Sequence, residues 1–160
     1  MQRRHLLGAA ALATSFIWGA IPASAADQRG VTDTEIIIGT ITDLSGVTAV
    51  QGVNNSDAIR MAFDEANAKG GVHGRKIKYI VEDNQYTVPR SVQAMNKLLN
   101  NDNIFLALSD GGTPMNDANM PAEFEKGVPN VLPLTAARKV RMRNSGRFSK
   151  GKGVRWPWIT

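Results

Sequence analysis

One stretch, residues 54–83, constrains the fold most, because a helix pattern, a stop signal and a strand pattern follow one another in it without a gap. Its first part carries an apolar stripe at helical spacing, formed by Ile59, Ala62, Phe63 and Ala66. Such a stripe predicts an amphipathic helix. A cation and two glycines at residues 69–71 then predict its end. After a polar turn at residues 73–75, the alternation over residues 76–83 predicts a strand.

Three further strands are expected, at residues 35–41, 104–108 and 131–134. The first is a β-branched run that is too apolar to have one face in water, which indicates a central parallel strand. Helical segments separate the strands at short spacing. Strands that alternate with helices in this way predict an α/β fold, in which a parallel sheet is wound with right-handed crossovers.

Capping residues predict where the helices begin. The candidates for the N-cap are Asn54, Asn55 and Ser56 in the first helix and Thr87 in the second. Pro89 fits the first turn of the second helix, where its missing N–H costs nothing. A third, polar helix is expected near residues 116–126, and Pro121 is expected to distort it.

Ligands of parallel α/β sheets bind at the carboxyl ends of the strands, where loops and helix N-termini present backbone N–H groups. Three loops should lie at that edge: residues 43–52, 109–114 and 135–137. The glycines of the second loop let the backbone approach a ligand, and Thr113 brings a hydroxyl to a helix start that suits a carboxylate. The residues alone leave open the alternative that Ser109 and Thr113 only cap this helix.

The run ANAKGGVHGRKIKYIVED, residues 66–83, resembles the helix-turn-strand signature of the leucine-binding type of periplasmic solute receptor. That family supplies amino acids and related solutes to ABC importers. The residues that carry the resemblance are Asn67, Gly70, Gly71, Gly74 and Asp83. The resemblance extends over about residues 32–138. It implies the fold of a type I periplasmic binding protein, as a three-layer lobe of sheet and helices that is truncated before the second lobe.

The same resemblance implies a ligand site. In the family, loops after the third and fourth strands hold the ligand's α-carboxylate and α-ammonium through a Ser or Thr and backbone groups. The matching positions are Gly112 and Thr113 in one loop and Leu134, Thr135 and Ala136 in the other. Gln51 falls where some members place a large side chain over the ligand. The implied ligand is a small amino acid or amide-like solute, the implied partner is the membrane permease of an ABC transporter, and we expect a monomer without a cofactor.

Residues 1–25 have the pattern of a signal peptide. Arg3 and Arg4 precede an uncharged apolar run, and Ala23-Ser24-Ala25 provides a small-x-small cleavage site. We therefore expect cleavage after Ala25 and export to the periplasm, while the choice between the Sec and twin-arginine routes stays open. Because the sequence has no cysteine, neither a disulfide nor a lipoprotein thiol is available.

The formal charge of +5 is distributed unevenly between two regions of the chain. All fourteen acidic residues lie within residues 26–137, which we expect to form the N-terminal lobe of the receptor. Residues 138–160 contain basic residues and no acidic ones. We expect this basic segment to be unrelated to the family, as the result of a frame slip or a truncation after Ala137 or Arg138.

The alternative function for this protein is that of a ligand-sensing or anionic-surface-binding module without a transport role. Binding of nucleic acid is disfavoured because an exported protein meets little of it.

No catalytic motif is present. The sequence lacks HExxH, G-x-S-x-G and Walker-type phosphate loops, and it has no cysteine nucleophile. Asp43, Asp83 and Asp110 fall near strand ends, which permits a metal site but is also typical of loop capping. We expect no enzyme, no catalytic residue and no metal.

One lobe provides roughly half of a receptor's ligand contacts. A micromolar dissociation constant, which corresponds to a binding free energy of about −8 kcal/mol, would therefore weaken to a millimolar one, about −4 kcal/mol.

Overall fold

The computed structural model describes residues 28–136. The expected signal peptide and the expected basic segment therefore lie outside the described residues. Within residues 28–136, none of the helices is both long enough and apolar enough to cross a membrane.

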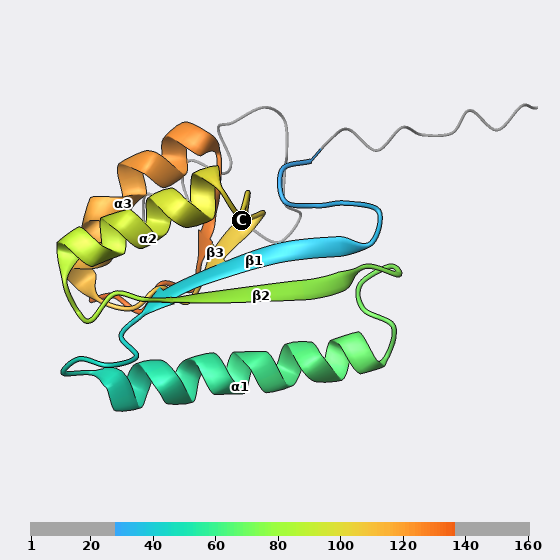
Figure 1. The fold of residues 1–160 in the computed structure, drawn as a ribbon, viewed down its shortest axis with the longest axis horizontal. Coiled ribbons are helices and arrows are strands. Elements are labelled where there is room, and N and C mark those ends of the chain that lie inside the picture. Colours follow the sequence, from blue (N-terminus) through green and yellow to red (C-terminus); the bar gives the residue numbers. More distant parts are fainter. Residues whose placement is uncertain (1–27, 137–160) are drawn as a thin grey trace, which may run out of the picture.

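Strands and helices alternate along the described chain, as predicted. The elements are β1 (Glu35–Thr42), α1 (Ala49–Ala68), β2 (Lys76–Asp83), α2 (Val88–Asn100), β3 (Leu106–Leu108), α3 (Thr113–Lys126) and β4 (Asn130–Val131). All pairings in the sheet are parallel, and the strand order is β2-β1-β3-β4. Helix α1 covers one face, and α2 and α3 cover the other (Figure 1). The three-layer α/β prediction is confirmed.

The predicted start of the first helix is wrong. Helix α1 begins at Ala49, after Thr48, and not at residues 54–56. The reason is the Asp43 carboxylate, which accepts hydrogen bonds from the backbone N–H groups of Gly46 (2.5 Å) and Thr48 (2.7 Å) and so folds the loop tightly. A Cβ atom at Gly52 would lie only 1.9 Å from the Asp43 carbonyl oxygen, so glycine is needed where the helix passes this loop.

The second helix begins after Thr87 with Pro89 in its first turn, as predicted. The third begins three residues earlier than predicted and continues through Pro121 to Lys126. The strand predicted at residues 131–134 is shorter and begins earlier, at Asn130. It ends because Leu132 adopts a φ of 52°, which is outside the extended region.

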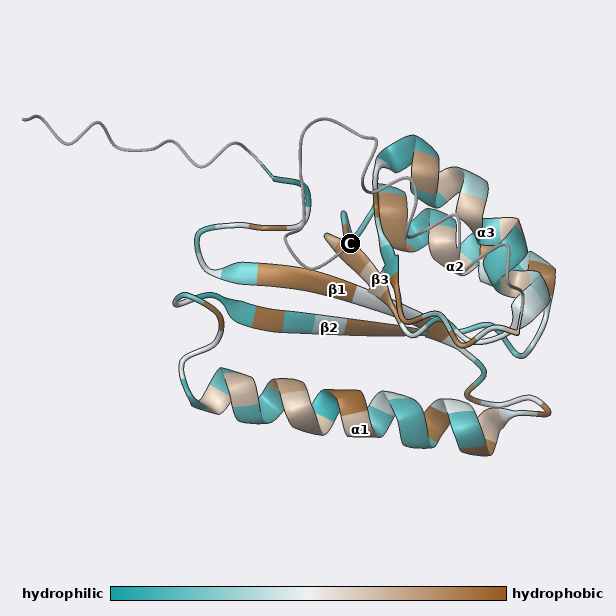
Figure 2. Cartoon of the chain, turned by 180° about the vertical axis from the view of Figure 1, so that it is seen from behind, coloured by the Kyte–Doolittle hydropathy of each residue, from teal (hydrophilic) through white to brown (hydrophobic). Residues whose placement is uncertain are grey.

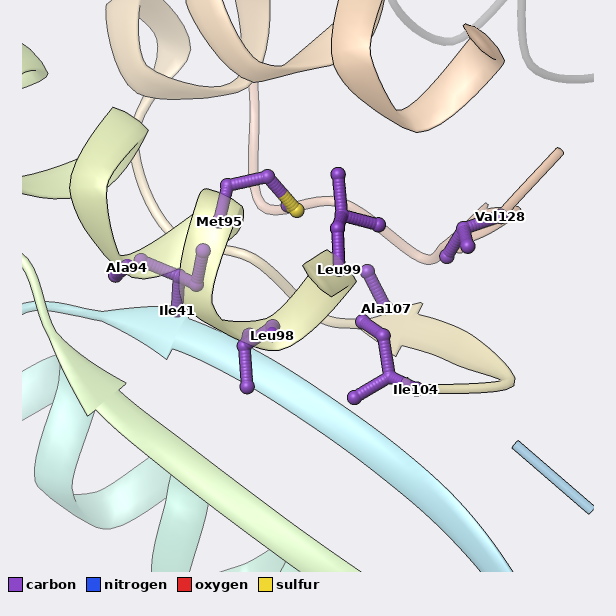
Figure 3. Packing of buried hydrophobic residues seen from close by; sticks show 8 residues of the cluster. All are labelled: Ile41, Ala94, Met95, Leu98, Leu99, Ile104, Ala107 and Val128. Atoms are coloured by element: carbon purple, nitrogen blue, oxygen red, sulfur yellow. The ribbon is translucent and has the colours of Figure 1, made fainter. Parts of the chain in front are cut away.

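The hydrophobic core lies between the sheet and α2. Its buried members are Ile41, Ala94, Met95, Leu98, Leu99, Ile104, Ala107 and Val128 (Figure 3). Gly39 allows α2 to approach the sheet closely, because a Cβ atom there would lie 2.9 Å from Leu98 Cδ1. This packing fixes β1 and β3, whose carboxyl ends lead into the loops discussed below.

The face covered by α1 is packed less tightly. Of the predicted apolar stripe, Ile59, Phe63 and Ala66 are half-buried and Ala62 is exposed. Figure 2 shows polar and apolar residues interspersed along α1. The main contact is an edge-to-face pair between Phe63 and Tyr79, with ring centroids 5.3 Å apart. The helix is present as predicted, but its amphipathic pattern is weak and its apolar stripe is only partly covered within the described residues.

Candidate functional site

Two loops lie side by side at the carboxyl edge of the sheet, one after β3 and one after β4. The Gly112 N–H donates to the Leu134 carbonyl (3.1 Å), and the Leu134 N–H donates to the Asp110 carbonyl (2.9 Å). Gly111 and Leu134 form an isolated parallel bridge. We call residues 109–113 and 132–136 the edge loops. The two loops expected from the sequence to act together are therefore paired through their backbones.

Thr113 is the point at which the edge loops converge. Its Oγ1 accepts a hydrogen bond from the Ala136 N–H (3.1 Å) and lies 3.2 Å from Thr135 Oγ1. Thr113 is the first residue of α3, and the residue before it, Gly112, has a φ of 97°. The positive end of the helix dipole thus coincides with two hydroxyl groups, an arrangement that favours an anionic group such as a carboxylate.

The alternative that Ser109 and Thr113 only cap α3 is wrong. Helix α3 has no side-chain cap hydrogen bond. Ser109 Oγ instead accepts a hydrogen bond from Asn55 Nδ2 (3.1 Å), which ties α1 to the β3 loop. Capping therefore does not account for either hydroxyl.

Five of the six predicted ligand residues come together: Gly112, Thr113, Leu134, Thr135 and Ala136. Gln51 is exposed in the first turn of α1 instead of in a loop. Among the described residues, no hydrogen bond joins Gln51 to the edge loops. Asn55, one helical turn further along, makes that connection.

Tyr86 is a neighbour of the edge loops that the sequence did not indicate. A Cβ atom at Gly112 would lie 3.5 Å from Tyr86 Cε2, so the ring borders this glycine. Tyr86 has a φ of 54° and donates its N–H to Asn84 Oδ1 (2.9 Å). A positive φ at a tyrosine cannot be predicted from the sequence, because the residues that favour a positive φ are chiefly Gly and Asn.

A group of buried polar side chains lies behind the edge loops. Its members are Asp110, Asn116, Glu123 and Asn130, and we call them the buried polar cluster. The Asp110 carboxylate accepts the Ile41 N–H (2.7 Å), and Asn130 Nδ2 lies 3.0 Å from Glu123 Oε1. Burial raises the pKa of Asp110 well above its usual range, and the charge of Glu123 raises it further. Burial also raises the pKa of Glu123 to about 7, against the opposing effect of the Asn130 hydrogen bond.

Two of the aspartates near strand ends shape loops. The Asp83 carboxylate accepts hydrogen bonds from the Leu44 N–H (2.9 Å) and Ser45 Oγ (2.6 Å), and Asp43 binds its own loop as described above. Burial acts to raise the pKa of each, but these hydrogen bonds outweigh it and lower the pKa of both carboxyls. Loop capping thus accounts for Asp43 and Asp83. Within residues 28–136, no group of three or more potential ligands could hold a metal ion.

Comparison with known proteins gives the family. The family model described as periplasmic binding protein matches residues 35–152. The chain belongs to this family. Its members are solute-binding proteins and not enzymes, and they act in the periplasm. No curated protein matches the chain.

Solved periplasmic binding proteins share the fold. One is a possible leucine/isoleucine/valine-binding protein from Rhodopirellula baltica, 27% identical over 74% of this chain and 31% of its own, with a TM-score of 0.65. Another is a fatty acid ABC transporter substrate-binding protein from Thermomonospora curvata, 31% identical over 64% of this chain and 26% of its own, with a TM-score of 0.57.

A third structure shows the fold alone. It is the branched-chain amino acid transporter substrate binding protein from Streptococcus pneumoniae, in complex with isoleucine, 22% identical over 69% of this chain and 32% of its own, with a TM-score of 0.65. The chain spans between about a quarter and a third of the length of these structures. The resemblance to the leucine-binding type of receptor is confirmed at the level of family and fold.

One groove among the described residues of this periplasmic binding protein lies away from the edge loops. It has a volume of about 610 Å³ and follows β2 and α2, where its lining includes Glu82, Arg90 and Lys97. None of the predicted ligand residues lines it. The groove is polar, and its lining includes the ion pair between Lys97 and Glu82.

Proposed function

We propose that this lobe is part of the substrate-binding component of an ABC importer, and that it holds a small amino acid or amide-like solute at the edge loops. The observation that carries the proposal is the convergence of Thr113 Oγ1, Thr135 Oγ1 and the Ala136 N–H at the N-terminus of α3. A solute carboxylate at this point would accept hydrogen bonds from hydroxyls and backbone N–H groups. The helix dipole would add to their effect.

The backbone of the edge loops supports this arrangement. Because the Gly112 N–H and the Leu134 N–H bond across the two loops, the hydroxyls of Thr113 and Thr135 are held at a fixed separation. A preorganised pair of hydroxyls loses little entropy when a ligand binds. In the proposed mechanism the solute is captured here first, a second lobe closes over it, and a membrane permease receives it.

The proposed organisation has three parts. Residues 1–25 act as a signal peptide cleaved after Ala25, residues 26–137 form the lobe, and residues 138–160 follow as a basic segment. The family match extends to residue 152 and so reaches into that segment, which weighs against a separate origin. The intact mass of the exported protein, with peptide mapping across residues 130–160, tests both boundaries.

Replacing Thr113 by Val should weaken binding of leucine by about tenfold, because the variant keeps the size of the side chain but loses the hydroxyl. Isothermal titration of the chain with leucine measures the effect. This lobe alone should bind with a dissociation constant on the order of 1 mM.

The matched control is Thr34→Val. Thr34 is exposed just before β1, at the opposite edge of the sheet, so this variant should bind leucine like the unaltered chain. Equal affinities of the Thr113 variant and the unaltered chain would exclude the hydroxyl from the site. Titration with valine, isoleucine and a fatty acid would then show which solute class the lobe prefers.

A further inference from the structure

The buried polar cluster contains two carboxyl groups that no cation accompanies. Asp110 is 2% exposed and Glu123 is 1% exposed. Within residues 28–136, no Lys, Arg or His lies within ion-pair distance of either one; the ion pairs there involve Lys69 and Lys97. A buried ionised carboxylate is costly unless it is paired, so a bound proton is the remaining way to neutralise it.

The hydrogen-bond geometry within the cluster also indicates that one carboxyl group carries a proton. Asn130 Nδ2 faces three acceptor oxygens: Glu123 Oε1 at 3.0 Å, Asn116 Oδ1 at 3.2 Å and Asp110 Oδ2 at 3.3 Å. An amide nitrogen carries only two hydrogens, so it cannot serve all three acceptors at once. A proton on one carboxyl group supplies the missing donor.

The cluster is joined directly to the edge loops. Asn116 Nδ2 donates to the carbonyl oxygens of Asp110 (2.9 Å) and Gly112 (2.8 Å). The same Asp110 carbonyl accepts the Leu134 N–H from the other edge loop. A change in the charge of the cluster therefore acts on the backbone that positions Thr113.

We propose that the buried carboxyl groups of Asp110 and Glu123 are both protonated below neutral pH, and that release of the proton from Glu123 near neutrality shifts the edge loops. Glu123 and Asp110 are thus positioning residues that act through Asn116 and Asn130. The loop shift itself is independent of any ligand. Its effect on solute affinity rests on the function proposed above.

The groups around Glu123 support this assignment. Asp110 is the titratable side chain that faces it, and β4 contributes only the amide of Asn130. Helix α2 packs against α3 and carries Arg90 and Lys97 at exposed positions. The pKa of Glu123 is raised to about 7 by burial, so the proton is released near neutrality. The negative charge of Glu123 then repels the carbonyl and carboxyl oxygens around it.

Amide NMR spectra of the ¹⁵N-labelled chain, recorded between about pH 5 and 9, test the proposal. The amides of Gly112 and Leu134 should shift together with a midpoint near the pKa of Glu123, about 7. Glu123→Gln should abolish this titration, because Gln keeps the acceptor oxygen but cannot ionise. Glu125→Gln, at an exposed position on the same helix, should leave it unchanged.

Two outcomes would overturn the proposal: Gly112 and Leu134 amides that do not titrate in the unaltered chain, or a titration that persists in Glu123→Gln. If that variant does not fold, Asp110→Asn replaces it as the test. Asn keeps a neutral side chain at this position, so the titration should persist with its midpoint near 7; loss of the titration would assign it to Asp110 and contradict the role of Glu123.

Leucine binding provides a separate readout. Its affinity should fall by up to about tenfold between pH 6 and pH 8, because the loop arrangement that binds becomes the minor one. Binding that is independent of pH while the amides titrate would contradict the link to the ligand. Absence of leucine binding, with the amides still titrating, would count against the proposed function and leave the proton-linked cluster intact.

Discussion

Replacing Leu98 by Ala is expected to lower the free energy of unfolding by about 3 kcal/mol. Leu98 is 0% exposed and lies in the core between α2 and the sheet (Figure 3). Its Cδ1 occupies the space that Gly39 leaves open on β1, and its neighbours in the core include Ile41 and Ile104. Truncation would leave a cavity. Helix α2 cannot fill it by moving towards the sheet, because α2 already lies as close to β1 as Gly39 allows.

Urea denaturation followed by circular dichroism measures this effect. A domain of this size has a total stability on the order of 5–15 kcal/mol, so the loss is a large share of it. Val92→Ala is the matched control, because Val92 lies on the same helix but is 37% exposed. It should cost less than about 1 kcal/mol. Similar losses in the two variants would show that the core does not lie where α2 faces the sheet.

The free energy of unfolding should fall by about 3 kcal/mol as the pH rises from 4.5 to 7.5. Burial raises the pKa of Glu123 from 4.5 to about 7 in the folded chain. A carboxyl group with a raised pKa binds its proton more tightly in the folded state. Its contribution to stability is therefore complete below about pH 4.5 and is lost as the pH rises through 7. Asp110, whose pKa is also raised, acts in the same direction.

Urea midpoints measured at several pH values test this prediction. Glu123→Gln should flatten the dependence over this window, and the exposed control Glu125→Gln should preserve it. Asp43 and Asp83 act with the opposite sign and at lower pH, because their pKa values are lowered and their stabilisation is lost only as the pH falls through those values. Stability that rises between pH 4.5 and 7.5 would contradict the assignment of Glu123 as a buried, uncompensated carboxyl.

Local signals in the sequence predicted most of the fold. The stop at Gly70 and Gly71 and the strand that follows it involve residues close in sequence, and both were found as predicted. The wrong start of α1 had a local cause that the sequence also contains. Asp43 is followed by Gly46 and Thr48 at the spacing of a carboxylate that binds backbone N–H groups ahead of it. That pattern would have placed the helix start near residue 48.

The buried polar cluster could not be predicted in the same way. Helix α3 was predicted to be polar, and polar side chains usually face water, yet Asn116, Asn119 and Glu123 are buried. Asn116 and Glu123 are buried because Asp110 and Asn130, on other elements, supply their hydrogen-bond partners. Asn119 is buried because it donates to Ser91 Oγ on α2. These pairings depend on how α3 lies relative to α2 and β4, which local sequence patterns do not specify.

The candidate site itself was predicted from resemblance and only in part from physical chemistry. A glycine pair followed by Thr113 indicated a helix start that suits an anion, but the pairing with Thr135 and Ala136 arises from the parallel neighbours β3 and β4. Gln51 lies in α1 because the loop before this helix is shorter than predicted.

The most direct test of the central claim is an amide NMR titration of the chain with leucine, read residue by residue. We expect saturable shifts at Gly112, Thr113, Thr135 and Ala136, with a dissociation constant on the order of 1 mM. Such a result would locate a solute at the edge loops. Shifts confined to the groove along β2 and α2, or no shifts at any residue up to about 50 mM leucine, would contradict the account.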